Sequence, residues 1–452
     1  MPETESASDR YGWRRLAVGV VLAASAAGAA LLIIDDPLSA RAAALAAAAL
    51  VLWLSETVPP FVPTFALLAA APVVLGGFGP AYAPRAVATW AIDPVLGLFL
   101  GGFAMGSALA RHGLDAAVAA YVVRHARGRR SALVALVLGA AAFLSMWMSN
   151  TAAAAMLLAA LAPVLASADA PLRRGLLLAL AMGANFGGMA TPIGTGPNAI
   201  ALAALPPGTT VSFGHWMAFA VPLAAMALAV TWLLIRLLHP AACQGAFIAP
   251  AAERPQRTGG ARAVIALAVL AVAGWLGEPW HGVPAAVVSL ALATALFAGG
   301  LLRPRDLGLI DWSTLLLIAG GLALGRLLEQ AGLVGALTGQ LHAAGIAPTT
   351  AVVALVLLTA CLSAVMSNTA TATMLVPVAA QLDPASPALP ILIALGASFG
   401  MPFAISTPPN AMVVGAGLRG RELLVPGVTV MIGGSVLLAL TGPAVLRWFG
   451  IG

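Results

Sequence analysis

The sequence predicts an all-α polytopic membrane protein, built as an inverted repeat of about 11 transmembrane helices plus two re-entrant hairpins, with two broken helices. Hydrophobic residues make up 61% of the 452 residues and charged residues 8%, against roughly 25% charged residues in a soluble domain. Long stretches contain no Asp, Glu, Lys or Arg, namely 131–168, 175–235, 331–382 and 384–418. The second half of the chain also repeats motifs of the first half in the same order.

The chain begins with a polar segment and an apolar run at 16–34, which is too long for a signal-peptide core and lacks a clear cleavage site. We expect residues 1–40 to be an N-terminal tail and a first transmembrane helix. The net charge of +6 is not interpreted as a nucleic-acid-binding surface, because most of the arginines lie on the predicted cytoplasmic side of the membrane. We expect no nucleic-acid partner. Cys243 and Cys361 lie in different segments, which excludes a disulfide framework or a paired-cysteine metal site.

The repeat is visible as ordered matches whose offset drifts from 221 to 212, as small loop insertions would produce. Gly-Gly-Phe-Ala-Met-Gly at 101–106 matches Gly-Gly-Leu-Ala-Leu-Gly at 320–325, and we interpret both glycine runs as helix-packing surfaces. Ser-Asn-Thr at 149–151 recurs at 367–369, each time with a serine four positions earlier. Two related bundles around a central site are typical of transporters.

The first repeat spans 41–240 and is predicted to contain, in order, helices near 41–55, 59–78 and 90–124, a hairpin at 131–166, a broken helix at 171–205 and a helix near 212–238. A cytoplasmic linker at 241–261 leads to the second repeat, 262–452. Its predicted elements are helices near 262–276, 283–301 and 311–344, a hairpin at 349–381, a broken helix at 387–416 and a last helix near 425–448.

The two hairpins are predicted because each segment of about 35 residues can hold two half-length helices and carries Ser-Asn-Thr at its middle. These residues are preferred helix N-caps. A polar tip inside a membrane is tolerated only where it faces protein or a cavity. The next segments break at Thr-Pro-Ile-Gly-Thr-Gly-Pro-Asn, 191–198, and at Ser-Thr-Pro-Pro-Asn, 406–410.

The arginines support this topology. With the N-terminus in the cytoplasm, the basic groups around Arg14, Arg129 and Arg173 fall inside, and Arg41, Arg85 and Arg447 fall outside. In this arrangement the two repeats enter the membrane from opposite sides. We expect a multi-pass protein of the inner (plasma) membrane.

The repeated motifs concentrate oxygen atoms where a membrane span should have none, and sodium prefers oxygen ligands. Ser145, Ser149, Asn150 and the Gly194 carbonyl could form one sodium cage. The other could combine Ser363 and Asn368 with the carbonyls of Met366 and Ser406.

The same tips suit an anion, because helix N-termini carry partial positive charge and unpaired N–H groups. Asn150, Thr151, Asn368 and Thr369 are placed to bind two carboxylates. No arginine lies near these motifs, so a bound dianion requires cations to compensate its charge.

Each motif also has a structural interpretation. A single Ser-Asn-Thr is more often a packing feature of membrane helices, whereas the duplicated copies favour a transport site. Asp93 and Asp311 are interpreted as helix caps, and Glu56 and Glu329 as helix-end residues rather than proton carriers. A polytopic membrane enzyme would need an acid, a base or a metal at mid-depth, and the charge-free segments argue against it.

The paired Ser-Asn-Thr motifs, followed by TPIGTGPN and STPPN, resemble those of the divalent anion/sodium symporter family of the larger ion transporter superfamily. The resemblance covers the chain from about residue 40. It implies a homodimer in which a mobile transport domain moves like an elevator against a scaffold, with succinate, malate, fumarate, citrate or sulfate as substrate. The alternatives are a sodium-independent dicarboxylate exchanger and a symporter of another divalent anion.

The resemblance also assigns residues. It places one sodium ion at Ser145, Ser149, Asn150 and Gly194, and a second at Ser363, Met366, Asn368 and Ser406. It places the substrate between the two tips, at Asn150, Thr151, Thr195, Ser367, Asn368, Thr369, Thr407 and Pro408. One departure is Gly196, which stands where the family usually has a proline.

Overall fold

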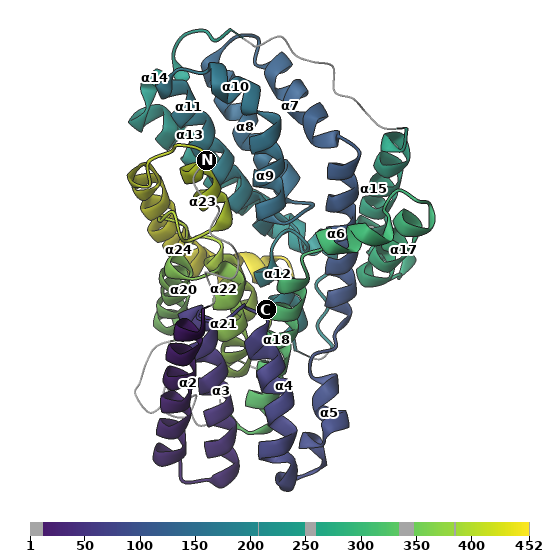
Figure 1. Cartoon of the computed structure of the whole chain (residues 1–452), viewed down its shortest axis with the longest axis vertical. Helices are drawn as coiled ribbons and strands as arrows, with labels where there is room; N and C mark the ends of the chain where they lie inside the picture. The colour runs from purple at the N-terminus through teal and green to yellow at the C-terminus, as the bar shows by residue number, and fades with distance from the viewer. Residues whose placement is uncertain (1–11, 207, 249–258, 334–347, 384–385, 452) are drawn as a thin grey trace.

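The computed structural model describes residues 12–206, 208–248, 259–333, 348–383 and 386–451 as an elongated bundle of helices (Figure 1). These residues form α-helices and short 3-10 helices and contain no β-strand, apart from one isolated bridge between Arg129 and Ala246. The predicted all-α class is confirmed.

An N-terminal bundle is formed by α2 (Trp13–Ile33), α3 (Pro37–Ser55), α4 (Val62–Leu75) and α5 (Pro84–Thr89), at the lower end of Figure 1. The Asp36 carboxylate accepts a hydrogen bond from the Ser39 amide at 2.8 Å, and Pro37 stands in the first turn. Both features favour a helix start, which places the beginning of α3.

The predicted helix at 90–124 is divided into α6 (Pro94–Arg111) and α7 (Leu114–His125). Gly113 separates them at φ 71°, a left-handed conformation that glycine adopts without steric cost. Asp93 caps α6 by accepting a hydrogen bond from the Val95 amide at 2.8 Å, as expected.

The first hairpin consists of α8 (Arg130–Ser145) and α9 (Asn150–Ala160), followed by the short α10 (Ala162–Ser167). The next helix, α11 (Ala170–Gly187), packs along α8 and is capped by Asp169. Hydrogen bonds from the Arg130 guanidinium and the Leu172 amide lower the pKa of Asp169. Arg130 and Asp169 therefore join the open end of the hairpin to the helix that follows it.

The first broken helix consists of α11, η3 (Gly188–Ala190) and α12 (Gly196–Ala203), with a non-helical segment at 191–195. The repeat closes with α13 (Phe213–Leu238) and α14 (Pro240–Cys243). The start of the predicted linker pairs with the turn before α8, since the Phe247 amide donates to the Gly128 carbonyl at 2.9 Å. Linker residues 249–258 lie outside the described residues.

The second repeat contains the same kinds of element in the same order. They are α15 (Ala261–Leu276), α16 (Glu278–His281), α17 (Ala285–Ala298), η4 (Pro304–Leu309), α18 (Trp312–Gln330), α20 (Pro348–Val365), α21 (Asn368–Leu382), α22 (Ala388–Ala397), α23 (Pro408–Gly415) and α24 (Arg421–Trp448). Helix α18 ends before the predicted limit of 344, and the chain turns at Gly332, φ 64°. Residues 334–347 lie outside the described part, and the opposite orientation of the repeats and the domain boundaries stay predictions.

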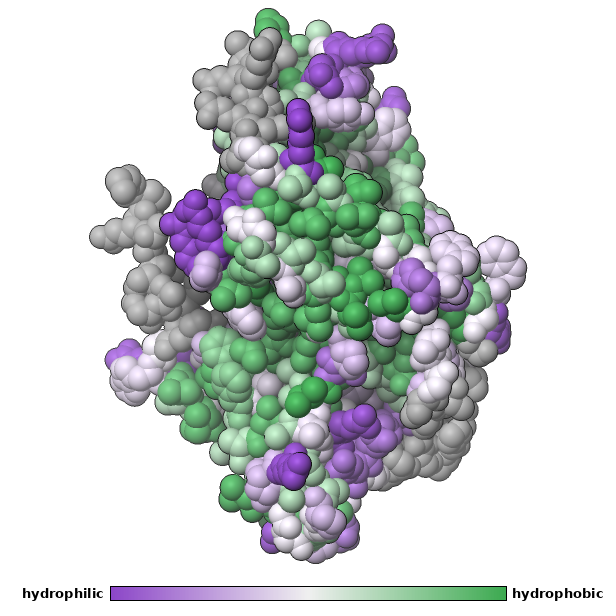
Figure 2. All heavy atoms as spheres, turned by 90° about the vertical axis from the view of Figure 1, so that its right-hand side faces the viewer, coloured by the Kyte–Doolittle hydropathy of each residue, from purple (hydrophilic) through white to green (hydrophobic). Residues whose placement is uncertain are grey.

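Among the described residues, six helices are long and apolar enough to cross a membrane: α2, α3, α6, α13, α18 and α24. Three of the four hairpin arms, α8, α9 and α20, belong to a set of shorter apolar helices. Figure 2 shows a large hydrophobic area in the middle of the face that carries α15 and α17, with hydrophilic residues in separate groups around it. The chain is a multi-pass membrane protein.

Buried apolar side chains form two clusters. The larger cluster includes side chains from α6 to α13, from α15 and α17, and from α22 to α24. The smaller cluster joins Trp53 and Leu67 of the N-terminal bundle to Leu324 of α18 and to Met366 and Ala370 of the second hairpin. The tip of the second hairpin therefore packs against the N-terminal bundle.

Candidate functional site

Each hairpin tip ends in a serine that caps the second arm. The Ser149 hydroxyl accepts a hydrogen bond from the Ala152 amide at 3.2 Å, and the Ser367 hydroxyl accepts one from the Ala370 amide at 3.2 Å. These contacts satisfy one unpaired amide of each helix start and leave others free. The sequence thus places a helix N-terminus at each tip.

A group of three oxygen atoms lies next to each tip. Ser145 Oγ is 2.7 Å from Asn150 Oδ1 and 2.6 Å from the Ala184 carbonyl oxygen. Ser363 Oγ is 2.8 Å from Asn368 Oδ1 and 2.7 Å from the Ala397 carbonyl oxygen. Each serine hydroxyl has a single proton. It can donate to the asparagine oxygen or to the carbonyl oxygen, and the other acceptor is left without a proton from this group. A hard cation is the ligand that such oxygens favour.

The first oxygen group extends to the broken helix. A Cβ atom at Gly188 would lie 2.2 Å from Asn150 Oδ1 and 3.0 Å from the Gly194 carbonyl oxygen. Glycine at 188 is therefore required for the broken helix to approach the tip this closely. The structure brings Ser145, Asn150 and the Gly194 carbonyl together.

The second broken helix is joined to the second hairpin by Ser406. Its hydroxyl donates to the Ala364 carbonyl at 2.5 Å and accepts a hydrogen bond from the Phe403 amide at 3.1 Å. In the first repeat the Thr191 hydroxyl makes a similar bond to the Met146 carbonyl. Both breaks are thus fixed against a hairpin tip.

Two buried asparagines hold the non-helical segments in shape. Asn198 Nδ2 donates to the carbonyls of Gly188 and Thr191 at 3.1 and 2.8 Å. Asn410 Nδ2 donates to the carbonyls of Met401 and Phe403 at 3.0 and 2.9 Å. In a continuous helix these backbone carbonyls would accept hydrogen bonds from backbone amides. Here they accept them from an asparagine side chain instead.

A pocket of about 260 Å³ lies where the two tips and the two broken helices meet. It is lined by most of the predicted site residues: Ser149, Asn150, Thr151, Gly194, Thr195, Ser367, Asn368, Thr369, Ser406, Thr407 and Pro408. Ser145, Ser363 and Met366 are buried and do not line it.

The electrostatics of the pocket come mainly from helix ends. The first residues of α9, α12, α21 and α23 all line it. Each N-terminus contributes partial positive charge. α23 adds no free amide, because Pro408 and Pro409 have no N–H and the Asn410 amide is bonded to the Thr407 hydroxyl. Among the lining residues in the described part of the chain, Asp311 is the one ionisable side chain, and no basic side chain is present.

Sequence reasoning missed part of this lining, namely Pro60, Phe103, Gly196, Asp311, Ser313, Thr314, Leu317 and Pro409. Asp311 caps α18, as expected, by accepting a hydrogen bond from the Thr314 amide at 3.0 Å. The available signal was the three polar residues Asp311, Ser313 and Thr314, at the start of the helix carrying the second glycine run. These residues lie at the start of α18, whereas the repeated motifs lie on the hairpins and the broken helices. The spacing of the motifs therefore could not indicate that the start of α18 lines the pocket.

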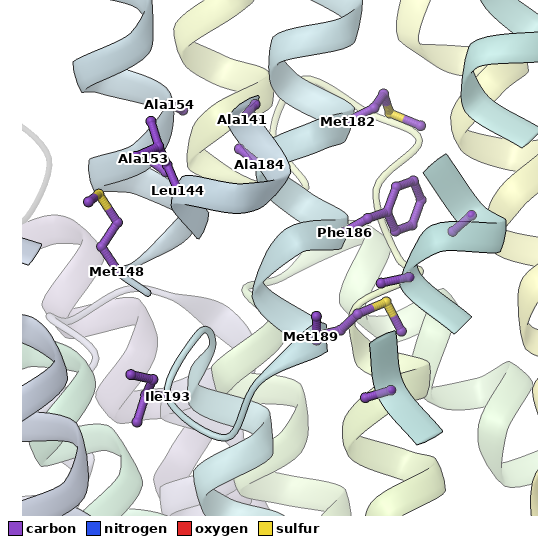
Figure 3. Close-up of a cluster of buried hydrophobic side chains, with 14 of the residues drawn as sticks. Ala141, Leu144, Met148, Ala153, Ala154, Met182, Ala184, Phe186, Met189 and Ile193 are labelled. Atoms are coloured by element: carbon purple, nitrogen blue, oxygen red, sulfur yellow. The ribbon is translucent and has the colours of Figure 1, made fainter. Parts of the chain in front are cut away.

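Apolar side chains support the first tip from behind. Figure 3 shows Leu144 and Ala153 of the first hairpin near Ala184 of the broken helix, with Met148 and then Ile193 lower in the view, all within the larger buried cluster. Trp147 stacks nearly parallel to Phe213 and Trp275, with ring centroids 6.3 Å away in both cases. The aromatic contact packs this tip against α13 and α15.

Membrane-length helices around a polar pocket closed by half-helices define a membrane transporter rather than an enzyme. The chain belongs to the citrate transporter family, whose profile matches residues 30–398. The resemblance inferred from the paired Ser-Asn-Thr motifs is confirmed.

The chain is also similar to individual proteins. The chain is 28% identical over 424 residues to an uncharacterized transporter of Haemophilus influenzae, covering 87% of this chain and 88% of that protein. It is 27% identical over 408 residues to the sodium-dependent dicarboxylate transporter SdcS of Staphylococcus aureus, covering 81% and 78%. Its fold is similar to the crystal structure of the Alcanivorax borkumensis YdaH transporter, with a TM-score of 0.57, 18% identity and coverage of 87% and 99%.

Proposed function

We propose that the protein is a secondary active transporter that carries C4-dicarboxylates such as succinate, malate and fumarate together with sodium ions. The observation that supports this most is the pocket between the two hairpin tips, in which helix N-termini and oxygen atoms are combined without a basic side chain. A volume of about 260 Å³ is at the small end for ligand pockets and suits a small anion. The names of the SdcS relatives support the same substrate and ion.

In this proposal one sodium ion binds at Ser145, Ser149, Asn150 and Gly194, and a second at Ser363, Met366, Asn368 and Ser406. The substrate carboxylates bind at Asn150, Thr151, Thr195, Ser367, Asn368, Thr369, Thr407 and Pro408. A dianion beside Asp311 is strongly unfavourable alone, and two sodium ions in the adjoining oxygen groups offset its charge. Transport then follows an elevator-like movement in a homodimer of the inner membrane, with the N-terminus in the cytoplasm.

Uptake by proteoliposomes tests the coupling. We expect an inward sodium gradient to drive accumulation of labelled succinate, and replacement of external sodium by choline to abolish it. Accumulation that does not depend on sodium would establish the dicarboxylate exchanger instead. Because the family is named for citrate transport, citrate is the second candidate substrate, and competition by unlabelled citrate or sulfate ranks the anions.

The site itself is tested with Asn150→Ala and Asn368→Ala. Each change removes an amide that would bind both an ion and the substrate, and a lost hydrogen bond to a charged group costs about 1.5–3 kcal/mol, or roughly 10- to 100-fold in uptake at low substrate. Thr294→Ala is the control, since this exposed α17 side chain bonds only to the Leu290 carbonyl and does not line the pocket. Normal uptake in both asparagine variants would refute the proposed site.

A further inference from the structure

Glu56 ends α3 in an unusual backbone conformation. Its φ is 47°, in the left-handed region, and among the described non-glycine residues only Arg127 shares a positive φ. Glycine is the usual residue in this position after a helix, because a side chain adds steric cost there. A glutamate is therefore unusual in this position, and its side chain contacts a distant part of the chain.

The Glu56 carboxylate contacts the tip of the second hairpin. The backbone N–H of Ser367 donates to Glu56 Oε1 at 3.3 Å, across 311 residues of sequence. Ser367 caps α21 and lines the pocket, so this amide stands at the N-terminus of a helix that faces the pocket, next to the residues proposed to bind the substrate. The Glu56 carboxylate is therefore an anion of the protein itself that binds a backbone donor at the second tip.

The contact is held by packing on both sides. Trp53 is buried and its Nε1 donates to the Pro60 carbonyl at 2.9 Å, which fixes the turn that carries Glu56. Met366 and Ala370 on either side of Ser367 belong to the same buried cluster as Trp53. The end of α3 and the second tip thus pack together, and the Glu56–Ser367 contact lies at the exposed edge of this surface.

The first tip has a matching glutamate that is not engaged. Trp275-Leu276-Gly277-Glu278 after α15 repeats Trp53-Leu54-Ser55-Glu56 at a constant offset of 222 residues. Trp275 Nε1 likewise donates to a carbonyl beyond the turn, that of Ala285, at 3.2 Å. In the described part of the chain the Glu278 side chain has no hydrogen bond or ion pair, and the first tip is held by the Trp147 stack instead.

We propose that Glu56 is a latch on the second hairpin that the substrate releases. In the empty carrier its carboxylate holds the Ser367 amide, and an arriving substrate carboxylate displaces it, because both anions compete for the same donor and repel each other. Glu278 is the equivalent group for the Ser149 amide when the carrier faces the opposite side. That the competing anion is a dicarboxylate rests on the proposed function.

Hydrogen exchange tests the contact without any substrate. In Glu56→Gly the backbone keeps its left-handed turn without strain, so we expect a folded protein whose Ser367 amide exchanges about tenfold faster in sodium buffer. Glu278→Gly is the matched control and should leave this amide unchanged. Equal exchange in the wild type and in Glu56→Gly, or equal acceleration by both variants, would overturn the latch.

Uptake then tests the competition. Without the internal anion, the apparent KM for succinate in Glu56→Gly should fall by about fivefold, as expected when the binding-competent fraction rises. A structural defect would raise KM or lower the maximal rate, so an unchanged or higher KM would overturn the competition. If the wild type transports no dianion, the proposed function fails, and the exchange experiment still decides the latch.

Discussion

Single residues decide how closely the halves of the site approach. Gly196 begins α12, and a Cβ atom there would lie 2.5 Å from the methyl group and 2.6 Å from the hydroxyl of Thr369. The equivalent position in the second repeat is Pro408, which carries a full ring. The glycine that departs from the family pattern thus leaves the space that the Thr369 side chain fills.

We therefore expect Gly196→Ala to displace Thr369 and to raise the KM for succinate severalfold, because a contact below 3 Å forces the side chain out of its position. Gly139→Ala is the control, since nothing lies within 4 Å of a Cβ atom there. Combining Gly196→Ala with Thr369→Ser, which removes the nearest atom and keeps the hydroxyl, should recover part of the affinity. Unchanged kinetics in Gly196→Ala would contradict the packing argument.

At the scale of elements, the two broken helices are joined by side chains. Asn185 Nδ2 of α11 donates to Asn410 Oδ1 of α23 at 3.0 Å. In the repeat, Ser398 is equivalent to Asn185, and Asn198 is equivalent to Asn410. The symmetry-related contact would therefore join Ser398 to Asn198. Ser398 Oγ and Asn198 Oδ1 are both buried without a partner, because serine is too short to repeat the asparagine contact. The pair of helices is therefore linked on one side more strongly than on the other.

Asn410→Ala should be strongly destabilising. It removes two bonds to backbone carbonyls and the one from Asn185, and leaves these buried groups unpaired, at a cost of about 1–3 kcal/mol for each. Thermal unfolding in detergent measures the effect. Ser435→Ala is the control, because that buried hydroxyl has no partner and its removal should be nearly neutral. Equal melting temperatures of the two variants would contradict the bracing role of Asn410.

At the scale of the whole molecule, the two buried clusters divide the site between them. The first tip belongs to the larger cluster, and the second tip packs in the smaller cluster with the N-terminal bundle. The pocket is lined by residues of both tips, so a ligand that fills it contacts both. Ligand binding should for that reason stabilise the whole fold.

A thermal-shift series tests this coupling. Succinate at about 100 times its dissociation constant should add about 2.7 kcal/mol of stability in sodium buffer. It should add little in choline buffer, because the pocket offers no basic side chain and already contains Asp311. Citrate and sulfate serve as comparison ligands. An equal shift by succinate in both buffers would contradict the charge compensation by sodium.

The sequence by itself determined the membrane class, the repeated order of elements and most of the residues around the pocket. These features depend on composition, on periodic apolar segments and on local rules for caps and breaks, so they can be read along the chain. Ser149, Ser367, Asn150 and Asn368 lie at helix starts because their residue types favour such starts anywhere.

Only the tertiary structure decided which distant groups meet. The contact of Glu56 with the Ser367 amide, the Asn185–Asn410 bond and the place of Asp311 in the pocket each join segments more than 100 residues apart or in different repeats. Sequence reasoning assigned Glu56 and Asp311 to helix ends, which is where they lie. It could not show what these ends face, because the facing side depends on how whole helices pack and not on the residues next to them.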